Sequence, residues 1–212
     1  MKKFVAVLRS GTWLTRERIR LVALACLALT LVALAGIVAT AHGLTDYKGR
    51  PVGTDFASFY AAGASVLAGE PDAPFDPARQ FARERAIFGD GTQFYAWQYP
   101  PFFLLVAAVL ALLPYYWALA LWQFGTFALY LFSVSAVIRS TAPGRPMDRL
   151  ALLVAAAYPA VFVNAGHGQN GFLSAALVGL ALAFLRVRPL LAGTFIGLLA
   201  YKPQLGLIAP FA

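Results

Sequence analysis

Long stretches without a single charged residue dominate this sequence. Residues 21–43, 101–138 and 150–185 contain no Asp, Glu, Lys or Arg, and the final run, 189–212, contains only Lys202. A helix needs about 20 apolar residues to cross the hydrocarbon core of a bilayer, and the first run is long enough by itself. The composition is 60% hydrophobic and 12% charged, against about 25% charged in soluble domains. The sequence therefore predicts an all-α, polytopic integral membrane protein.

The basic residues are concentrated before the first apolar run. Six bases and one acid, Glu17, precede residue 21, which is the pattern of a cytoplasmic flank. The net charge of +8 therefore does not indicate nucleic-acid binding, which would also favour aromatic side chains among the bases. The run is longer than a signal-peptide core. Residues 1–20 are predicted to be a cytoplasmic tail and residues 21–43 a retained first transmembrane helix, in which the sole cysteine, Cys26, has no disulfide partner.

A polar interval, residues 44–100, separates the first two apolar runs. It carries seven acids and five bases, and we expect it to lie outside the cytoplasm. It is too long for a loop without structure of its own. A first helix is predicted from six residues spaced along one helical face, namely Phe56, Phe59, Tyr60, Gly63, Val66 and Leu67.

A second helix in this interval is predicted to begin at Asp76–Pro77 and to run to Gly89. An aspartate N-cap followed by proline at the first helical position is a typical helix start. Both helices are too short and polar to span a bilayer. We expect two juxtamembrane helices on the bilayer surface, the first with its aromatic face on the lipid; the alternative is a small loop packed on itself. In the second helix, Arg79, Arg83, Glu84 and Arg85 are expected on the polar side and Phe81, Ile87 and Phe88 on the apolar faces.

The short run 101–113 leaves two membrane layouts open. As a helix it covers about 20 Å, less than the ~30 Å hydrocarbon core, whereas residues 115–138 are long enough to cross alone. In one layout both segments cross, and the loop 139–149 lies outside. In the favoured layout residues 101–113 form a re-entrant or tilted half-helix, which places the arginines of 139–149 and 186–189 inside, as the positive-inside rule requires.

Two polar motifs stand out in the first half of the chain. Thr54-Asp55 begins a predicted helix, where an N-cap contributes about 1 kcal/mol, and where a carboxylate at a water–lipid interface could also take a proton from a hydroxyl. Both interpretations stay open. The motif WQYPPFF (97–103) is stiffened by its prolines, and its Trp97 and Tyr99 fit an interfacial aromatic belt.

Two further motifs lie in the later apolar runs. NAGHGQNG (164–171) combines three glycines with His167, Gln169 and Asn170, so the backbone could approach a ligand closely; a tight turn between helices is the alternative. YKPQ contains Lys202, whose ammonium could pair with a phosphate or extend to the interface from a helix end.

In this order the motifs resemble glycosyltransferase family 87. The resemblance rests on GTDFASFYAAGASVLAGE, on YPPFF with a following LLP, on GHGQNG and on YKPQ, and it extends over most of the chain from about residue 50. Members are integral-membrane enzymes of the GT-C class, similar to α-mannosyltransferases that use polyprenyl-phosphate mannose. The resemblance implies a multi-pass bundle of GT-C type in the cell (inner) membrane, which transfers a hexose to a glycan or glycolipid acceptor on the extracytoplasmic side.

The resemblance also implies roles for individual residues. The family's catalytic acid, in the first external loop, falls on Asp55, which would act as base on an acceptor hydroxyl. Lys202 and His167 would stabilise the leaving phosphate, and Gln169 and Asn170 would bind sugar or phosphate oxygens. The remaining expected substrate-binding residues are Tyr60, Tyr99 and Gln204.

Neither a metal site nor a complete enzyme is predicted from these residues. The chain contains no DxD pattern, so no metal ligand is assigned, and a requirement for a divalent metal is left open. The sequence stops within an apolar stretch, about halfway through such an enzyme. We therefore expect an N-terminal portion of a longer protein.

The prenyl tail of the donor is expected in an apolar groove beside residues 101–113 and 115–138. A flippase or transporter for lipid-linked precursors would need a similar groove, although no Asp or Glu lies in an apolar run, where ion-coupled transport would favour one. A non-catalytic membrane subunit is the third alternative, and its polar motifs should tolerate alanine.

Overall fold

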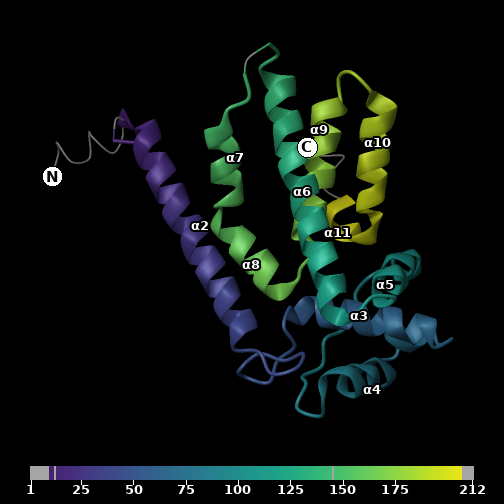
Figure 1. Cartoon of the computed structure of the whole chain (residues 1–212). Helices are drawn as coiled ribbons and strands as arrows, with labels where there is room; N and C mark the ends of the chain where they lie inside the picture. Colours follow the sequence, from purple (N-terminus) through teal and green to yellow (C-terminus); the bar gives the residue numbers. More distant parts are fainter. Residues whose placement is uncertain (1–9, 12, 145, 207–212) are drawn as a thin grey trace.

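The protein is an all-α bundle, described here from a computed structural model (Figure 1). The structure describes residues 10–11, 13–144 and 146–206. Parts of the predicted tail and of the final apolar run, residues 1–9 and 207–212, lie outside the described residues. The described residues form helices and turns, with isolated β-bridges in the turn before α3.

Two helices in the described part of the chain are long and apolar enough to cross a membrane. They are α2, Arg16–Ala39, and α6, Tyr115–Thr141. A third candidate span is the pair α7, Arg149–Ala156, and α8, Pro159–His167, which bends by 48° at the break between them. The break falls at Pro159, because proline lacks the N–H that a continuous helix would need. The predicted all-α membrane bundle is confirmed.

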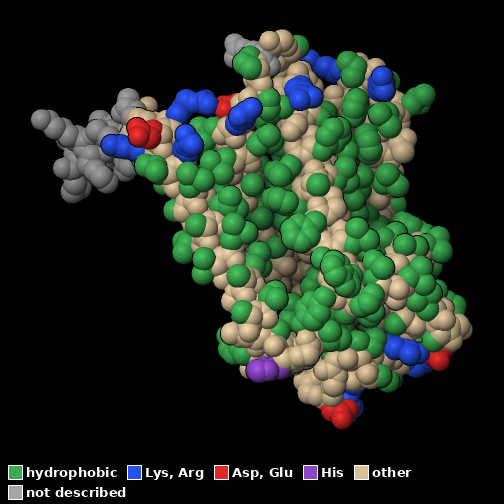
Figure 2. All heavy atoms as spheres, viewed as in Figure 1, with side chains coloured by type: hydrophobic (Ala, Val, Ile, Leu, Met, Phe, Trp, Pro, Cys, Tyr) green, Lys and Arg blue, Asp and Glu red, His purple; other side chains and the backbone are tan. Residues whose placement is uncertain are grey.

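The arginine-bearing ends of these helices lie together. Arg16 at the start of α2 forms an ion pair of 2.8 Å with Asp148, the N-cap of α7. Lys and Arg side chains gather along this end of the molecule, at the top of Figure 2; we call it the basic end. The connection between α6 and α7 therefore lies beside the start of α2, as in the layout in which residues 101–113 do not cross alone.

The opposite end contains two short helices in close contact, α3 (Thr54–Leu67) and α5 (Leu104–Ala111), the latter preceded by the 3-10 turn η2 (Pro101–Phe103). Gly63 makes this contact possible, because a Cβ atom at that position would lie 2.1 Å from the carbonyl oxygen of Ala107. Only glycine allows two helix backbones to approach so closely.

The aromatic face of α3 is covered by protein. Phe56 is 1% exposed and Phe59 is 4% exposed. The expectation that this face rests on lipid was wrong, because η2, α5, α6 and the segment before η2 pack over it. The rings around Phe59 lie with centroids 5.3–6.1 Å away and belong to Trp97, Tyr99, Phe103 and Trp122.

Helix α4, Pro77–Phe88, confirms the predicted second helix of the polar interval and follows the 3-10 turn η1, Ala73–Phe75. The side chain of its N-cap, Asp76, accepts hydrogen bonds from the first turn of the helix. One expectation was wrong: Glu84 is 0% exposed and faces inward. The reason is that α4 packs against α3 and the segment after it, so its Glu84 face is the buried one.

The second half of the bundle is built on α9, Gly171–Phe184, and α10, Pro189–Leu198. α9 runs along α6, where Gly179 allows close packing, since a Cβ there would lie 2.9 Å from the Ser133 hydroxyl. After α10 the chain returns through η3, Leu199–Tyr201, and α11, Pro203–Gly206, toward the aromatic core.

Candidate active site

Two glycines bring the ends of α3 and α8 together. Gly53 precedes α3 with φ 75°, and Gly168 follows α8 with φ 66°, both in the left-handed region. A Cβ at Gly168 would lie 3.4 Å from the Cα of Gly53 and 2.6 Å from the Cβ of Phe56. The two backbones can touch because neither position has a side chain, so the residues beside each glycine face one another.

Asp55 and Gln169 meet across this junction. The Gln169 side-chain amide donates a hydrogen bond to the Asp55 carboxylate. Beside it, the Thr54 hydroxyl lies 2.7 Å from Nδ1 of His167. If the hydroxyl is the donor, the neutral imidazole carries its proton on Nε2, where it could donate to a ligand oxygen.

Asp55 is not the N-cap of α3. That position is Gly53, without a side-chain capping bond, and Asp55 is the second residue of the helix. The capping interpretation was therefore wrong, because a glycine already turns the chain into the helix. An acid in the first turn still gains from the positive helix end. Asp55 remains half-buried with a carboxylate oxygen on Gln169.

The Gln169 peptide is fixed from two helices. Its carbonyl oxygen accepts hydrogen bonds from the side-chain amides of Gln123 on α6, at 3.2 Å, and Asn164 on α8, at 3.1 Å. The sequence reasoning missed Gln123, although a lone amide in the apolar run of α6 was a usable signal, since polar groups in such runs are costly and tend to be functional.

Asn170 joins this loop to the aromatic core. Its side-chain amide donates to the Tyr99 hydroxyl over 2.7 Å. Burial raises the pKa of Tyr99, and the Asp55 carboxylate adds to that rise. The Tyr99 hydroxyl therefore stays protonated at neutral pH, and its proton has no acceptor among the described residues. Tyr201, which is 1% exposed, holds Asn170 from the other side by donating to its carbonyl oxygen over 3.3 Å.

A cavity of about 420 Å³ opens beside Asp55. Its walls are Asp55 and Ser58 of α3 on one side and residues of the segment 94–99 on the other. Asp55 is the one carboxylate among the lining residues, and Tyr99 also lines the cavity. The arrangement places a proton acceptor and a proton donor at one small polar pocket.

The other predicted site residues lie at different distances from this pocket. Lys202 is half-buried at the end of η3, and burial lowers the pKa of its ammonium although the Asp55 carboxylate opposes that shift. Gln204 lies exposed in α11. The Tyr60 hydroxyl makes a structural hydrogen bond instead, which it donates to the carbonyl oxygen of Leu113 over 2.9 Å. The structure thus brings Asp55, His167, Gln169, Asn170, Tyr99 and Lys202 to one end of the molecule.

An apolar groove of about 420 Å³ runs between α5 and α6. Its walls include Leu105, Val109 and Leu121, which are exposed. Trp122 forms its inner wall and stacks on Phe59 at 5.3 Å. One turn earlier on α6, the Leu119 side chain lies beside the α3–α8 junction, since a Cβ on Gly53 or on Gly168 would be 3.1 Å from it. The groove therefore begins near the candidate site.

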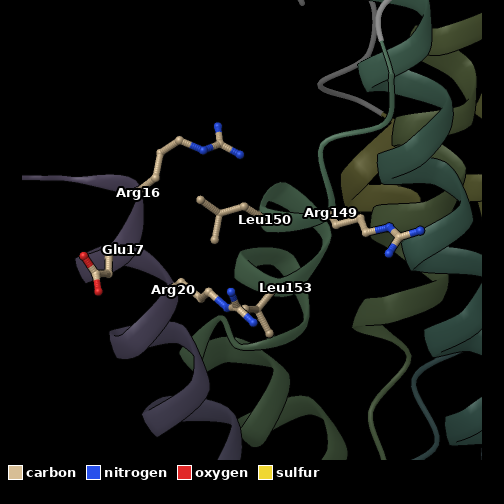
Figure 3. A pocket seen from close by; sticks show the side chains of 6 residues that line it. All are labelled: Arg16, Glu17, Arg20, Arg149, Leu150 and Leu153. Carbon is tan, nitrogen blue, oxygen red and sulfur yellow. The ribbon is translucent and has the colours of Figure 1, made fainter.

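A second cavity, of about 700 Å³, lies at the basic end between α2 and α7. Arg16 and Arg20 extend from α2 toward α7, and Arg149 points away from α2 (Figure 3). This cavity contains no residue of the Asp55 pocket. In the described part of the chain, no group of three or more His, Cys, Asp or Glu side chains is arranged to hold a metal ion.

Comparison with known proteins identifies one family. The family model described as glycosyltransferase family 87 matches residues 97–212. No curated protein and no solved structure matches the chain. The matched segment includes Tyr99, the α8–α9 loop and Lys202. Residues 50–96, which also carry the resemblance described above, lie outside it, and Asp55 joins the matched segment through Gln169.

Proposed function

The chain belongs to glycosyltransferase family 87, and on that premise we propose that it moves a hexose, mannose, from a polyprenyl-phosphate donor to a glycan or glycolipid acceptor. As a member of the family it is a membrane glycosyltransferase. The single observation that carries the finer proposal is the hydrogen bond from Gln169 to Asp55. It orients the one carboxylate of a pocket that opens between α3 and the segment 94–99.

In the proposed reaction Asp55 acts as general base. An acceptor hydroxyl gives its proton to the Asp55 carboxylate while its oxygen forms a bond to the anomeric carbon of the sugar. The bond from that carbon to the phosphate oxygen breaks on the opposite face, so the configuration inverts. The polyprenyl phosphate leaves with the bonding electron pair. Gln169 keeps one carboxylate oxygen occupied, which leaves the other for the acceptor.

Two cationic or proton-donating groups are suited to the departing phosphate. Lys202 carries an ammonium on the Asp55 side of the bundle, and His167 can donate from Nε2 when Thr54 donates to Nδ1. Charge that develops on the leaving oxygen is stabilised most by donors already in place. Asn170 and Tyr99 offer polar groups to sugar hydroxyls beside them. No step is assigned to a metal ion, and a donor that brings its own divalent ion is compatible with this scheme.

The groove between α5 and α6 supports a lipid-linked donor. It is apolar and opens on exposed leucines and valines, and its Trp122 follows Leu119, the α6 residue beside the α3–α8 junction, by one helical turn. A prenyl chain there would leave its phosphate near the candidate site. In this proposal the basic end faces the cytoplasm of the cell under the positive-inside rule, so the Asp55 pocket faces the extracytoplasmic side.

The test is transfer from radiolabelled polyprenyl-phosphate mannose by purified protein, with Asp55→Asn as the decisive variant. Loss of a general base lowers the rate by about 10²–10⁴-fold, whereas Asn keeps an oxygen for Gln169 and should leave membrane insertion unchanged. Asp90→Asn is the matched control, because Asp90 is exposed and pairs only with Arg85 among the described residues.

The outcomes separate the competing functions. Full transfer by Asp55→Asn, with insertion intact, would show that Asp55 is not the base. Movement of the labelled lipid across a proteoliposome without release of mannose would favour the flippase. A folded protein that neither transfers mannose nor moves the lipid, and whose four polar motifs tolerate alanine, would favour a non-catalytic subunit.

A further inference from the structure

Glu84 is a fully buried acid that the proposed reaction does not use. It is 0% exposed, although its neighbours Arg83 and Arg85 form ion pairs with Glu70 and Asp90 outside. An acid is almost never fully buried unless its oxygens have partners. The question is therefore what these partners do.

Both carboxylate oxygens of Glu84 accept hydrogen bonds that lead to the Asp55 pocket. The backbone N–H of Tyr95 donates to Oε2 over 3.0 Å, and the Gln80 side-chain amide donates to Oε1 over 3.0 Å. The same Gln80 nitrogen donates to the carbonyl oxygen of Ser58 over 3.1 Å. Ser58 on α3 and Tyr95 in the segment before η2 both line the pocket that contains Asp55, so each of these two elements forms one wall of it.

We propose that Glu84 is a positioning residue, whose ionised carboxylate holds the two walls of the Asp55 pocket at the separation that the sugar substrate requires. It fixes one wall directly at Tyr95 and the other through Gln80 at Ser58. The expected effect of Glu84 on catalysis rests on the proposed function, whereas its effect on the pocket walls does not. Glu84 makes no contact with the reacting atoms.

The ionisation of Glu84 decides whether this link is complete. Burial raises its pKa to about 7, against the opposing hydrogen bonds from Tyr95 and Gln80. A protonated carboxyl must itself find an acceptor. The side-chain oxygen of Gln80, Oε1, is buried and has no hydrogen-bond partner. It can accept a hydrogen bond from protonated Glu84 only if the Gln80 amide group turns over, and its nitrogen then no longer donates to the carbonyl oxygen of Ser58. Protonation therefore frees one wall.

Other charged groups lie near Glu84 and Gln80. The Asp55 carboxylate, with Asp46 and Arg50 from the turn before α3, acts on the Tyr95 hydroxyl. On α4 itself Arg79 pairs with Asp72 and Glu70, and Asp76 caps the helix. In the described residues none of these groups hydrogen-bonds Glu84.

The direct test is hydrogen–deuterium exchange of the full chain in detergent, followed in the peptide that covers 94–99. In wild type, exchange corrected for its intrinsic pH dependence should be faster at about pH 6 than at about pH 8, as Glu84 takes up its proton. Glu84→Gln mimics the protonated side chain. It should exchange about tenfold faster than wild type at about pH 8 and close to wild type at about pH 6, since charge-assisted bonds are roughly twice as strong as neutral ones. Glu70→Gln, the same change on the surface, should match wild type.

The kinetic test uses polyprenyl-phosphate mannose as the probe. At about pH 8, Glu84→Gln should raise the KM for this donor about tenfold and keep kcat within about twofold of wild type. Wild-type KM should rise as the pH falls from about 8 to about 6, and the variant should not show this rise. A wild-type KM and unchanged exchange in 94–99 would overturn the proposal. If Glu84→Gln does not fold, wild-type exchange in 94–99 that is independent of pH would overturn it. If exchange behaves as expected but the protein shows no transfer activity, only the proposed function is rejected, and the positioning role of Glu84 stands.

Discussion

The side-chain amide of Gln169 donates a hydrogen bond to the carboxylate of Asp55, although 114 positions of sequence separate the two residues. This bond crosses the junction of two helix ends, α3 and α8, each turned by a glycine in the left-handed region. It gives the carboxylate one fixed orientation. The remaining oxygen is left to the pocket beside it, which is what a general base requires.

Gln169→Ala should lower kcat about tenfold or more, because a hydrogen bond to a charged group contributes about 1.5–3 kcal/mol and here orients the base. KM for the donor should change little. The measurement is steady-state transfer from labelled polyprenyl-phosphate mannose. Gln93→Ala is the control, since Gln93 is exposed and lies outside the pocket. An unchanged kcat would assign Gln169 to structure only.

Lys202→Met should lower kcat by about 10²-fold, because it removes a preorganised cation from the departing phosphate. Lys202→Arg should retain more activity than the methionine variant. Lys48→Met is the matched control: its ammonium lies over the Tyr47 ring, 5.2 Å from the centroid, in the turn before α3. Equal kcat for Lys202→Met and wild type would mean that the lysine only extends to the interface.

Gly63→Ala should destabilise the fold by about 1–3 kcal/mol, the usual cost of overpacking. The new Cβ would meet the carbonyl oxygen of Ala107 at 2.1 Å, and a backbone atom cannot turn away. Thermal unfolding in detergent should show a lower Tm. Gly36→Ala has open space around it and should be neutral or stabilising by up to about 1 kcal/mol, because alanine favours helix. Equal Tm values for the two variants would contradict the close α3–α5 contact.

Stability should fall as the pH rises from about 4.5 to about 7. Glu84 has a pKa raised from 4.5 to about 7 by burial in the folded protein. Between these values the folded state binds more protons than the unfolded state, so the free energy of unfolding decreases with pH. The stabilisation from proton binding by Glu84 is fully present below the ordinary pKa of Glu, 4.5, and is lost as the pH rises through about 7.

The measurement is Tm against pH for wild type and Glu84→Gln. The variant cannot titrate at this position, so its profile should be flatter over the same range. Glu70→Gln, exposed and paired with Arg79, should retain the wild-type profile. Parallel profiles for wild type and Glu84→Gln would show that Glu84 does not titrate in this window.

The sequence predicted the class of fold well because the bilayer imposes strict rules. Runs of about 20 apolar residues must form helices, since their backbone groups find no water. The first long helix was predicted on this basis. α4 was also predicted within a residue of its bounds, because Asp76–Pro77 and Gly89 are local signals that need no tertiary partner.

Burial was predicted less well, and Phe56 and Glu84 show why. A stripe of aromatic residues along one helical face has the same sequence pattern whether lipid or protein covers it. Only the close approach at Gly63, which lets α5 reach α3, decides that Phe56 is buried by protein. Glu84 was placed on the polar side because it is charged, but its environment depends on α3 and on the segment at Tyr95.

By itself the sequence determined that this chain forms apolar helices, which residues are polar exceptions among them, and the order of the motifs that resembles glycosyltransferase family 87. These properties are local, because helix formation and transfer into lipid depend on residue type and spacing. The meeting of Asp55 with Gln169, and of Thr54 with His167, was decided only by the tertiary structure. It requires two glycine backbones in contact, and such a contact depends on how α3, α6 and α8 pack, which no single segment encodes.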